Sequence, residues 1–378
     1  MITFEIIDDL EEINGYYSEV DRMFDAGPYE ASLSVEWTEA LRKTHLGGAA
    51  YLLIVLRDSA EIVGIVPLCL REIKKYGLSL KTLAPIAEYF NTHSDLLLRR
   101  PSEEMIEVFL RALFSLKYKW DIFRINRFIE NCPTLGSITH LLENKSGLNY
   151  EIKRAEPSFF IKLDGNYNEF LKKKSANFRY KLKNASKRMH TMGNISFSGE
   201  QDFKDFDELY DIILSIEEES WKHKHGTAIT SSEKQHRFYK ELFGGAFEKK
   251  RLRLCLLCLN KEPIAFDAGL VKDKKYYCVH SSYNEKFKEG NPGTMLLAWF
   301  IEKLIRDGIE EYDWFGEPFE WESRWTDKFR WHKSLLLYNG TPKAKLFYVF
   351  NRLRNRSTNK VRNQIVLRNP RDIRPASS

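Results

Sequence analysis

The same order of secondary-structure elements is expected twice along this chain, and that repetition constrains the fold more than any other feature. Period-two and continuous apolar runs predict strands in both halves, and longer amphipathic runs predict helices. The first half is expected to contain strands at 51–56, 61–71 and 78–84, a helix at 101–116 and a strand at 121–128. The second half is expected to contain strands at 251–259, 262–271 and 275–283, a helix at 294–307 and a strand at 310–315.

Short stretches of sequence match at corresponding places in the two halves. Glu61-Ile-Val-Gly matches Glu262-Pro-Ile-Ala, and Trp120-Asp-Ile-Phe matches Tyr312-Asp-Trp-Phe. We interpret the repeat as a duplication of whole domains, with a chance likeness of two α/β halves as the alternative. The expected fold is α/β of the α+β type, with two tandem lobes, each a mixed, mostly antiparallel sheet flanked by helices. The lobes are expected at 1–155 and 156–342, followed by a basic tail at 343–378.

The positive charge is concentrated in that tail. Residues 343–378 hold ten Lys/Arg against one Asp, a local charge of +9, whereas the other 342 residues hold 49 Lys/Arg and 52 Asp/Glu, a charge of −3. This distribution argues against a body that binds nucleic acid generally. No stretch has the roughly 18 consecutive apolar residues of a membrane span, and the acidic start Met1-Ile-Thr-Phe-Glu has no apolar signal core, so we expect a cytoplasmic protein.

A glycine-containing loop in the second half is the clearest candidate for a ligand site. Gly290, Asn291, Gly293 and Thr294 immediately precede the apolar helix at 294–307. Glycine and asparagine tolerate backbone angles that aim successive N–H groups at one centre, and the start of a helix attracts phosphate. The alternative is an ordinary turn. Neither the P-loop nor the dinucleotide-binding fingerprint occurs, which argues against nucleotide hydrolysis and a Rossmann cofactor.

The segment 275–315 resembles the acetyl-CoA-binding motif of GNAT acyltransferases, whose loop reads Arg/Gln-x-x-Gly-x-Gly/Ala. Lys288 falls on the Arg/Gln position, Asn291 on the first Gly and Gly293 on the last, so the chain departs from the pattern at Lys288 and Asn291. Residues 30–340 resemble the two-lobed branch with CelD-like cellulose-biosynthesis acyltransferases and FemAB-like peptidyltransferases. The shared features are Phe178-Arg-Tyr-Lys-Leu, Glu218-Glu-Ser-Trp221, Pro292-Gly-Thr-Met-Leu and Gly308 followed by Tyr312-Asp-Trp-Phe-Gly-Glu317. Trp321-Glu322 stands where that branch usually has Tyr-Lys.

The resemblance implies transfer of an acyl group from acetyl-CoA or another acyl-CoA, with no metal. It places the donor at Lys288, Gly290, Asn291, Gly293 and Thr294, and the thioester carbonyl beside backbone N–H groups of 279–283. Tyr283 is the candidate for reprotonating the leaving thiolate. Arg179, on a basic helix expected at 167–190, is a candidate for the donor phosphates, with a merely solvated charged face as the alternative.

Two carboxylates and one histidine are candidates for acid–base chemistry. A tight turn at 272–275 is expected to set Asp267 directly opposite His280, and a carboxylate that orients an imidazole makes a general base. The alternative is a pair that closes a polar gap in the sheet. Glu317, just past a strand end, is a second candidate, with a solvated loop carboxylate as its alternative. His223 and His225 alternate with lysines that repel a cation, so we interpret residues 221–225 as a solvated loop and expect no metal.

The sequence therefore predicts acyl transfer to an amine or hydroxyl, with a sugar or cell-envelope polysaccharide precursor as the acceptor by family analogy alone. The alternatives are aminoacyl transfer from charged tRNA and a non-catalytic, membrane-associated scaffold in polysaccharide biosynthesis. The tail mixes Leu346, Phe347, Val349, Phe350 and Leu353 with basic residues, which is typical of a helix that contacts an anionic membrane surface. Docking onto the body and RNA contact are the other interpretations of the tail.

Overall fold

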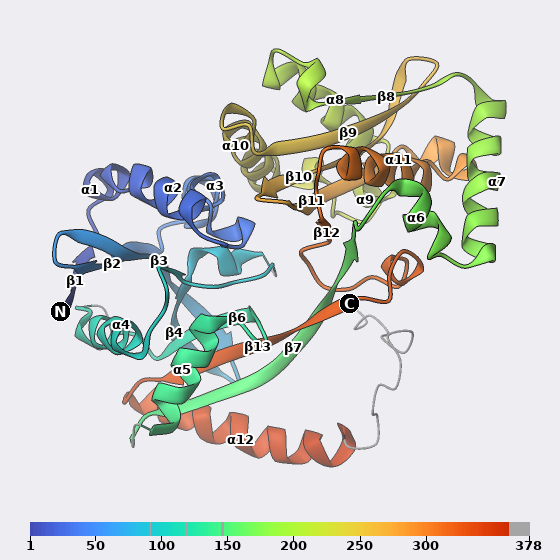
Figure 1. The fold of residues 1–378 in the computed structure, drawn as a ribbon. Coiled ribbons are helices and arrows are strands. Elements are labelled where there is room, and N and C mark those ends of the chain that lie inside the picture. The colour runs from blue at the N-terminus through green and yellow to red at the C-terminus, as the bar shows by residue number, and fades with distance from the viewer. Residues whose placement is uncertain (91, 118, 145–146, 363–378) are drawn as a thin grey trace. The chain divides into compact units, whose positions relative to one another are not determined.

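The computed structural model describes residues 1–378 except 91, 118, 145–146 and 363–378. The chain divides into two compact units, each built around its own sheet (Figure 1). Unit 1 comprises Met1–Ser158, Gly316–Ser323 and the chain from Phe329 onward, and unit 2 comprises Phe159–Phe315 and Arg324–Lys328. Within the described residues, no helix combines the length and the apolar character needed to cross a bilayer.

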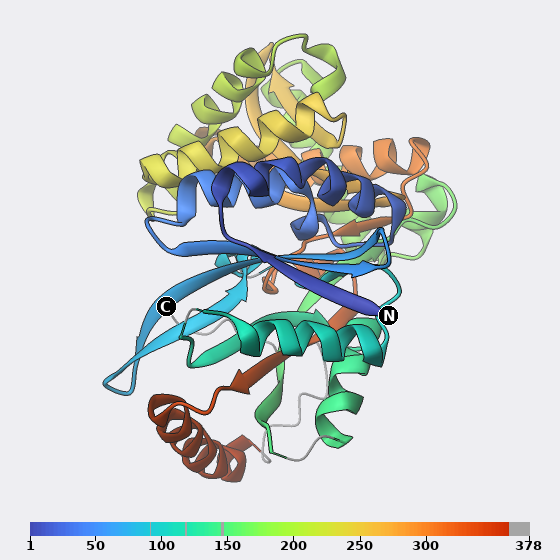
Figure 2. The same cartoon turned by 90° about the vertical axis from the view of Figure 1, so that its left-hand side faces the viewer.

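Unit 1 is a mixed sheet with helices on both faces (Figure 2). Its main strands lie in the order β1-β2-β3-β4-β6-β13-β7, and all neighbouring pairs with a described register are antiparallel except β4 and β6. The strands are β1 (Ile2–Ile7), β2 (Ala50–Asp58), β3 (Glu61–Lys75), β4 (Leu78–Pro85), β5 (Leu97–Leu98), β6 (Ile122–Ile129), β7 (Asn149–Lys162) and β13 (Phe329–Tyr338). The last residues of β7 belong to unit 2.

The helices of unit 1 bury apolar side chains, and α4 and α12 do so against the sheet. Helix α4, which Ser102 caps, packs with α5 over β2, β3 and β6 in a core that includes Phe109, Phe123 and Phe128. The helices are α1 (Leu10–Gly15), α2 (Tyr17–Ala26), α3 (Val35–His45), α4 (Glu103–Ser115), α5 (Pro133–Asn144) and α12 (Pro342–Arg362), with 3₁₀ turns at Ala31–Leu33, Ile86–Tyr89 and Glu322–Arg324.

Unit 2 repeats this plan. Its strands follow the end of β7 in the order β12-β11-β10-β9-β8 and are antiparallel except for the β11–β12 pair. They are β8 (Ile195–Gly199), β9 (Leu252–Leu259), β10 (Glu262–Lys272), β11 (Lys275–Tyr283) and β12 (Glu311–Asp313). The helices are α6 (Tyr167–Lys172), α7 (Ala176–Met192), α8 (Phe206–Glu218), α9 (Trp221–Lys224), α10 (Glu233–Glu248) and α11 (Pro292–Arg306), with 3₁₀ turns at Glu200–Asp202, Ile229–Ser231 and Glu285–Gly290.

The predicted repeat of elements is confirmed. In unit 1, β2-β3-β4 form an antiparallel meander, and α4 leads to β6, which runs parallel to β4. In unit 2, β9-β10-β11 form the same meander, and α11 leads to β12, which runs parallel to β11. The fold class, two lobes with mostly antiparallel mixed sheets flanked by helices, is therefore as expected.

Two expectations about individual helices need correction. The single basic helix expected at 167–190 is two helices, because the chain breaks at Lys173–Ser175 and the Ser175 hydroxyl caps α7 by accepting the Phe178 N–H at 3.1 Å. The expected loop 221–225 contains the short helix α9, whose Lys222 is largely buried. The tail at 343–378 begins as α12, and Ala344 and Phe347 pack there against Leu80, Ile122 and Tyr338 of unit 1.

Candidate functional site

The predicted pairing of Asp267 with His280 is wrong by one residue. From Lys272↔Lys275 to Gly269↔Cys278 the β10–β11 register follows the expected turn, but Ala268 then pairs with His280 and Asp267 with Ser281. Val279 is therefore the extra residue of a β-bulge. Because side chains alternate along a strand, a shift by one residue places Asp267 and His280 on opposite faces of the sheet.

Asp267 instead holds together the side of the sheet that packs against α11. Its two carboxylate oxygens accept hydrogen bonds from the hydroxyls of Tyr276 and Tyr312, each at 2.6 Å, and all three residues are buried. Burial raises the pKa of Asp267, and the two tyrosine hydrogen bonds oppose this shift. The Tyr276 ring also packs on Phe300 of α11. This geometry gives Asp267 a structural role under the helix.

His280 faces the other side, where a glutamate and a lysine surround it. Its Nε2 lies 3.1 Å from Oε2 of Glu217, the buried penultimate residue of α8, and 3.3 Å from Nζ of Lys222. The same Glu217 oxygen accepts the Ile229 N–H at 2.7 Å, and Lys222 donates to the Ser281 carbonyl at 2.6 Å. We call Glu217, Lys222 and His280 the histidine cluster.

Burial and charge fix the protonation states within the histidine cluster. Burial, followed by the positive charge of Lys222, lowers the pKa of His280 against the opposing effect of Glu217. Although burial alone opposes ionisation of Glu217, its contacts with His280 and Lys222 hold its pKa below the usual range. At neutral pH, a neutral His280 therefore donates Nε2–H to the Glu217 carboxylate, and its Nδ1 carries the lone pair of a base. Among the described residues, Nδ1 has no hydrogen-bond partner.

Glu217 and Lys222 were missed by the sequence reasoning, although one signal was present. Leu209, Ile213 and Ile216 form the apolar stripe of α8, and Glu217 continues that stripe one turn after Ile213. A carboxylate on the buried face of a helix needs a partner. Lys222 follows the exposed Trp221 on a short helix and gives no such signal.

The predicted donor loop is a 3₁₀ turn followed directly by α11. The N–H of Asn291 bonds to the Lys288 carbonyl at 3.0 Å, and the N–H groups of Thr294 and Met295 bond to the Asn291 carbonyl at 3.1 and 3.2 Å. Asn291 adopts the left-handed conformation (φ 55°, ψ 54°), which asparagine tolerates better than most residues do. The N–H groups of Asn291, Thr294 and Met295 are thus bonded within the loop and the start of α11. Pro292 has no N–H, so Gly293 supplies the N–H of the first α11 turn that these bonds do not use.

The flanks of the loop are an aromatic ring and a basic helix. A Cβ added to Gly293 would lie 3.6 Å from the Tyr283 ring, and a Cβ added to buried Gly290 would lie 2.2 Å from Sδ of Met189 in α7. Burial, followed by the charge of Glu285, raises the pKa of Tyr283, so its phenol is protonated at neutral pH. The Lys288 side chain is exposed.

Helix α7 presents cations beside this loop. Residues 176–192 contain no acid, and their exposed cations are Arg179, Lys181, Lys183, Lys187 and Arg188. Arg179 donates to the carbonyls of Leu171, Lys172 and Lys174 and so caps the end of α6. One nitrogen of its guanidinium makes all three bonds, which leaves the other side of the fork for an anion.

Glu317 belongs to the Gly316–Ser323 segment of unit 1, where it is exposed. Asp313, by contrast, is buried and accepts the Phe315 N–H at 2.7 Å, beside buried Phe315 at φ 61°, which is a structural role. No group of three or more His, Cys, Asp or Glu able to hold a metal ion occurs in the described ranges.

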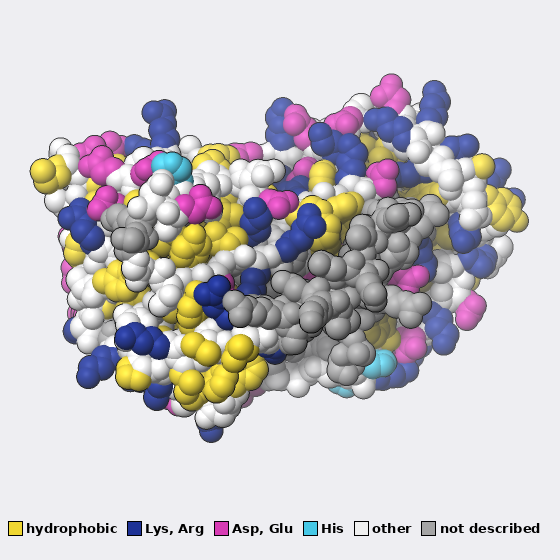
Figure 3. Space-filling model, turned by 90° about the horizontal axis from the view of Figure 1, so that it is seen from below, with side chains coloured by type: hydrophobic (Ala, Val, Ile, Leu, Met, Phe, Trp, Pro, Cys, Tyr) yellow, Lys and Arg dark blue, Asp and Glu magenta, His cyan; other side chains and the backbone are white. Residues whose placement is uncertain are grey.

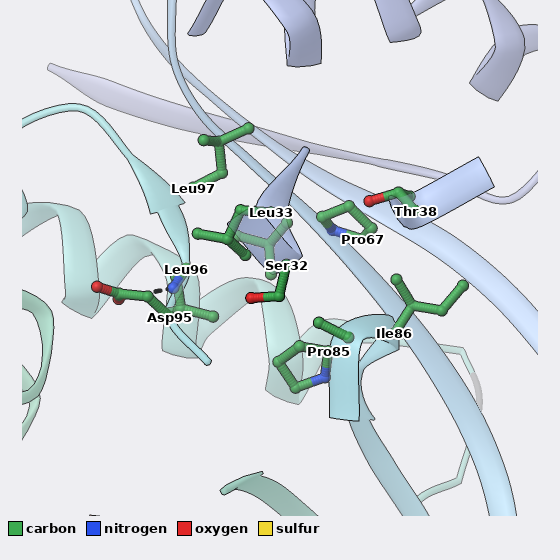
Figure 4. Close-up of a pocket in the computed structure, with 11 residues that line it drawn as sticks. Ser32, Leu33, Thr38, Pro67, Pro85, Ile86, Asp95, Leu96 and Leu97 are labelled. Atoms are coloured by element: carbon green, nitrogen blue, oxygen red, sulfur yellow. Dashed lines mark hydrogen bonds between the residues drawn. The ribbon is translucent and has the colours of Figure 1, made fainter. Parts of the chain in front are cut away.

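A small cavity lies in unit 1, away from every predicted site residue (Figure 4). Its volume of about 10 Å³ is close to that of one water molecule. Apolar side chains form most of its lining, with Ser32, Thr38 and Asp95 as the polar members.

Comparisons with known proteins agree with the geometry of unit 2 and with the repeated fold. Residues 176–323, which contain the histidine cluster and the loop, match the family described as acetyltransferase (GNAT) domain. FemX has a similar structure over 91% of this chain and 100% of its own, with a TM-score of 0.58 and 13% sequence identity. L-PGS from Bacillus licheniformis is similar over 91% of this chain and 96% of its own, with a TM-score of 0.54 and 12% identity.

A conserved protein of unknown function from Bacteroides thetaiotaomicron also shares the fold over 90% of this chain and 100% of its own, with a TM-score of 0.56 and 10% identity. A search of curated protein sequences found no match. The structural similarities show a shared fold over most of the chain. The family match places a GNAT acetyltransferase domain at residues 176–323.

Proposed function

We propose that this protein is an acyltransferase in which unit 2 moves an acyl group from acyl-CoA to an amine, with His280 as the general base. The observation that carries the proposal is the position of the histidine cluster on β11. This strand leads directly into the loop that contains Lys288, Gly290, Asn291, Gly293 and Thr294. A base three residues before the end of a strand is thereby placed next to a candidate donor site.

The proposed reaction uses groups whose protonation states suit it. The acceptor nitrogen attacks the thioester carbonyl carbon, its proton passes to Nδ1 of His280, and the C–S bond breaks. The departing thiolate takes a proton from the Tyr283 hydroxyl, whose raised pKa keeps it protonated at neutral pH. Glu217 stabilises the imidazolium that forms and holds the ring in place. His280 and Tyr283 lie on opposite faces of β11. For His280 to accept the acceptor's proton and Tyr283 to protonate the thiolate, the thioester must therefore lie at the end of the strand, where both faces can be reached.

A donor with several phosphates suits the surroundings of the loop. The exposed cations of α7 lie on the helix that contacts Gly290 through Met189, and Lys288 adds another. Since few loop amides remain for phosphate, side-chain cations are expected to contribute more of the binding here than in the family pattern. We propose Arg179 and Lys288 as the first two contacts for the donor phosphates. Glu317 stays a proposal for the acceptor side.

Aminoacyl transfer from charged tRNA is the second candidate, and the acid-free surface of α7 is the observation that favours it. The likeness to FemX supports the same candidate through the FemAB-like resemblance. For the acceptor we propose a sugar or cell-envelope polysaccharide precursor, by analogy with the CelD-like branch. As the setting we propose the cytoplasm, with peripheral contact at the inner membrane surface.

Isothermal titration of the full chain with acetyl-CoA tests the donor. We expect micromolar affinity that weakens several-fold in Lys288→Ala and at high salt. We also expect His280→Ala to bind acetyl-CoA like the wild type and to lose at least about 100-fold in thiol release with a panel of amino sugars. Absence of acetyl-CoA binding together with tight tRNA binding in a filter assay would replace this proposal with aminoacyl transfer. Absence of both acetyl-CoA binding and tRNA binding would favour the hypothesis of a non-catalytic scaffold.

A further inference from the structure

Helix α12 has two apolar stripes, and unit 1 covers one of them. Ala344, Phe347 and Asn351 recur at helical spacing and are buried, and Phe347 packs with Tyr338 and Tyr76. The opposite side bears a second stripe of similar length. Its members are Leu346 (44% exposed), Val349 (49%), Phe350 (38%) and Leu353 (57%).

The spacing of this second stripe is typical of a buried helix face. Positions 346, 349, 350 and 353 follow the i, i+3, i+4, i+7 pattern, and the centre of this stripe lies about 145° around the helix from the centre of the docked stripe. Single exposed apolar side chains are ordinary on a protein surface, whereas a contiguous row of four is not. Tyr76, 39% exposed at the β3–β4 turn, extends the row through an edge contact with Phe350.

Cations border the stripe on both sides. Lys345 and Lys343 lie on opposite flanks of the first turns, and Arg352 and Arg354 lie on opposite flanks about two to three turns later. Arg354 also donates to the Tyr76 hydroxyl at 2.8 Å. Residues 342–354 contain no acid, and exposed Lys74 and Lys75 add positive charge at the turn. Figure 3 shows hydrophobic side chains grouped beside Lys and Arg on the face of the molecule seen from below.

We propose that the second stripe of α12 and the β3–β4 turn dock on an anionic lipid bilayer. A helix that lies flat at the interface buries an apolar row among the acyl chains and sets flanking cations at the level of the headgroups, and the described part of α12 offers that arrangement. A second copy of the chain is a poorer fit, because a two-fold contact through this stripe would bring its basic flanks together. A nucleic acid would use the cations and leave the four apolar side chains in water.

Vesicle co-sedimentation of the full chain tests the proposal. We expect binding to phosphatidylcholine vesicles that contain about 30% phosphatidylglycerol, at least about tenfold weaker binding to pure phosphatidylcholine, and weakening of the former with salt. The double variant Val349→Asp/Leu353→Asp should lose at least about tenfold in binding to the anionic vesicles. Leu10→Asp, at a 51% exposed leucine of unit 1, is the matched control and should bind within about twofold of the wild type.

Circular dichroism and light scattering on the same variants complete the test. Since Val349 and Leu353 are exposed, both variants should keep the wild-type spectrum and mass. Unchanged binding of the folded double variant to anionic vesicles would overturn the proposal, and so would no binding of the wild type. A wild-type dimer that the double variant dissociates would assign the stripe to a second copy instead. Tight RNA binding that the apolar variants leave intact would assign the surface to nucleic acid.

Discussion

Asp95 offers a quantitative test of the electrostatics of unit 1. It lines the small cavity, and its carboxylate accepts the Leu96 N–H at 2.7 Å, as Figure 4 shows. Burial of the carboxyl, together with the weaker effect of Glu30, raises the pKa of Asp95 from 3.8 to about 7, against a hydrogen bond with Thr134. Between those two pH values the folded state holds a proton that the unfolded state has lost. The contribution of Asp95 to stability is therefore fully present below about pH 4 and is lost as the pH rises to 7.

The size of this loss follows from the shift. Each unit of pKa difference corresponds to about 1.4 kcal/mol, so a rise from 3.8 to about 7 corresponds to at most about 4 kcal/mol. Asp95→Asn keeps an oxygen that can accept the Leu96 N–H and does not ionise. We expect the variant to match the wild type near pH 4 and to be more stable by up to about 4 kcal/mol at pH 8.

Urea unfolding of both proteins from pH 4 to pH 8.5, followed by far-ultraviolet circular dichroism, measures the difference in unfolding free energy. Subtracting one pH profile from the other cancels the groups that the two proteins share. A difference that stays constant across this range would refute the reasoning, because it would mean that Asp95 ionises equally in the folded and unfolded states.

Two further predictions concern unit 2. Removing the charge of Lys222 by Lys222→Met should raise the pKa of His280 and move the acidic limb of the kcat/KM profile to higher pH, whereas Lys224→Met, at an exposed neighbour, should leave the limb in place. Gly290→Ala should cost about 1–3 kcal/mol in thermal unfolding, because its new Cβ would overlap a methionine side chain, and Gly293→Ala, which meets only an ordinary contact, should not. An unmoved pH limb, or equal stability of the two alanine variants, would contradict these assignments.

The sequence predicted most of the local structure and the repeat, because both depend on short-range patterns. Strand β13 was not predicted, since its place beside β6 results from a pairing across about 200 residues of chain that no local pattern encodes. The break between α6 and α7 was also missed. The helical pattern of the sequence continues on both sides of Ser175, so it fits one continuous helix as well as two helices with a cap at Ser175. The packing of α7 on the loop favours the second arrangement.

The strand that carries His280 was predicted, but the pairing of His280 with Asp267 was not, and one inserted residue explains the difference. A regular β10–β11 hairpin would put His280 on the same face as Cys278 and Asp267, under α11, where Tyr276 and Tyr312 already occupy the carboxylate. The Val279 bulge turns His280 to the α8–α9 side, where Glu217 and Lys222 set its protonation. Nothing in the composition of the strand distinguishes these two cases, because the alternation of apolar residues on both sides of the bulge fits either register. The bulge thus places the buried carboxylate of Asp267 and the imidazole of His280 on opposite faces of the sheet.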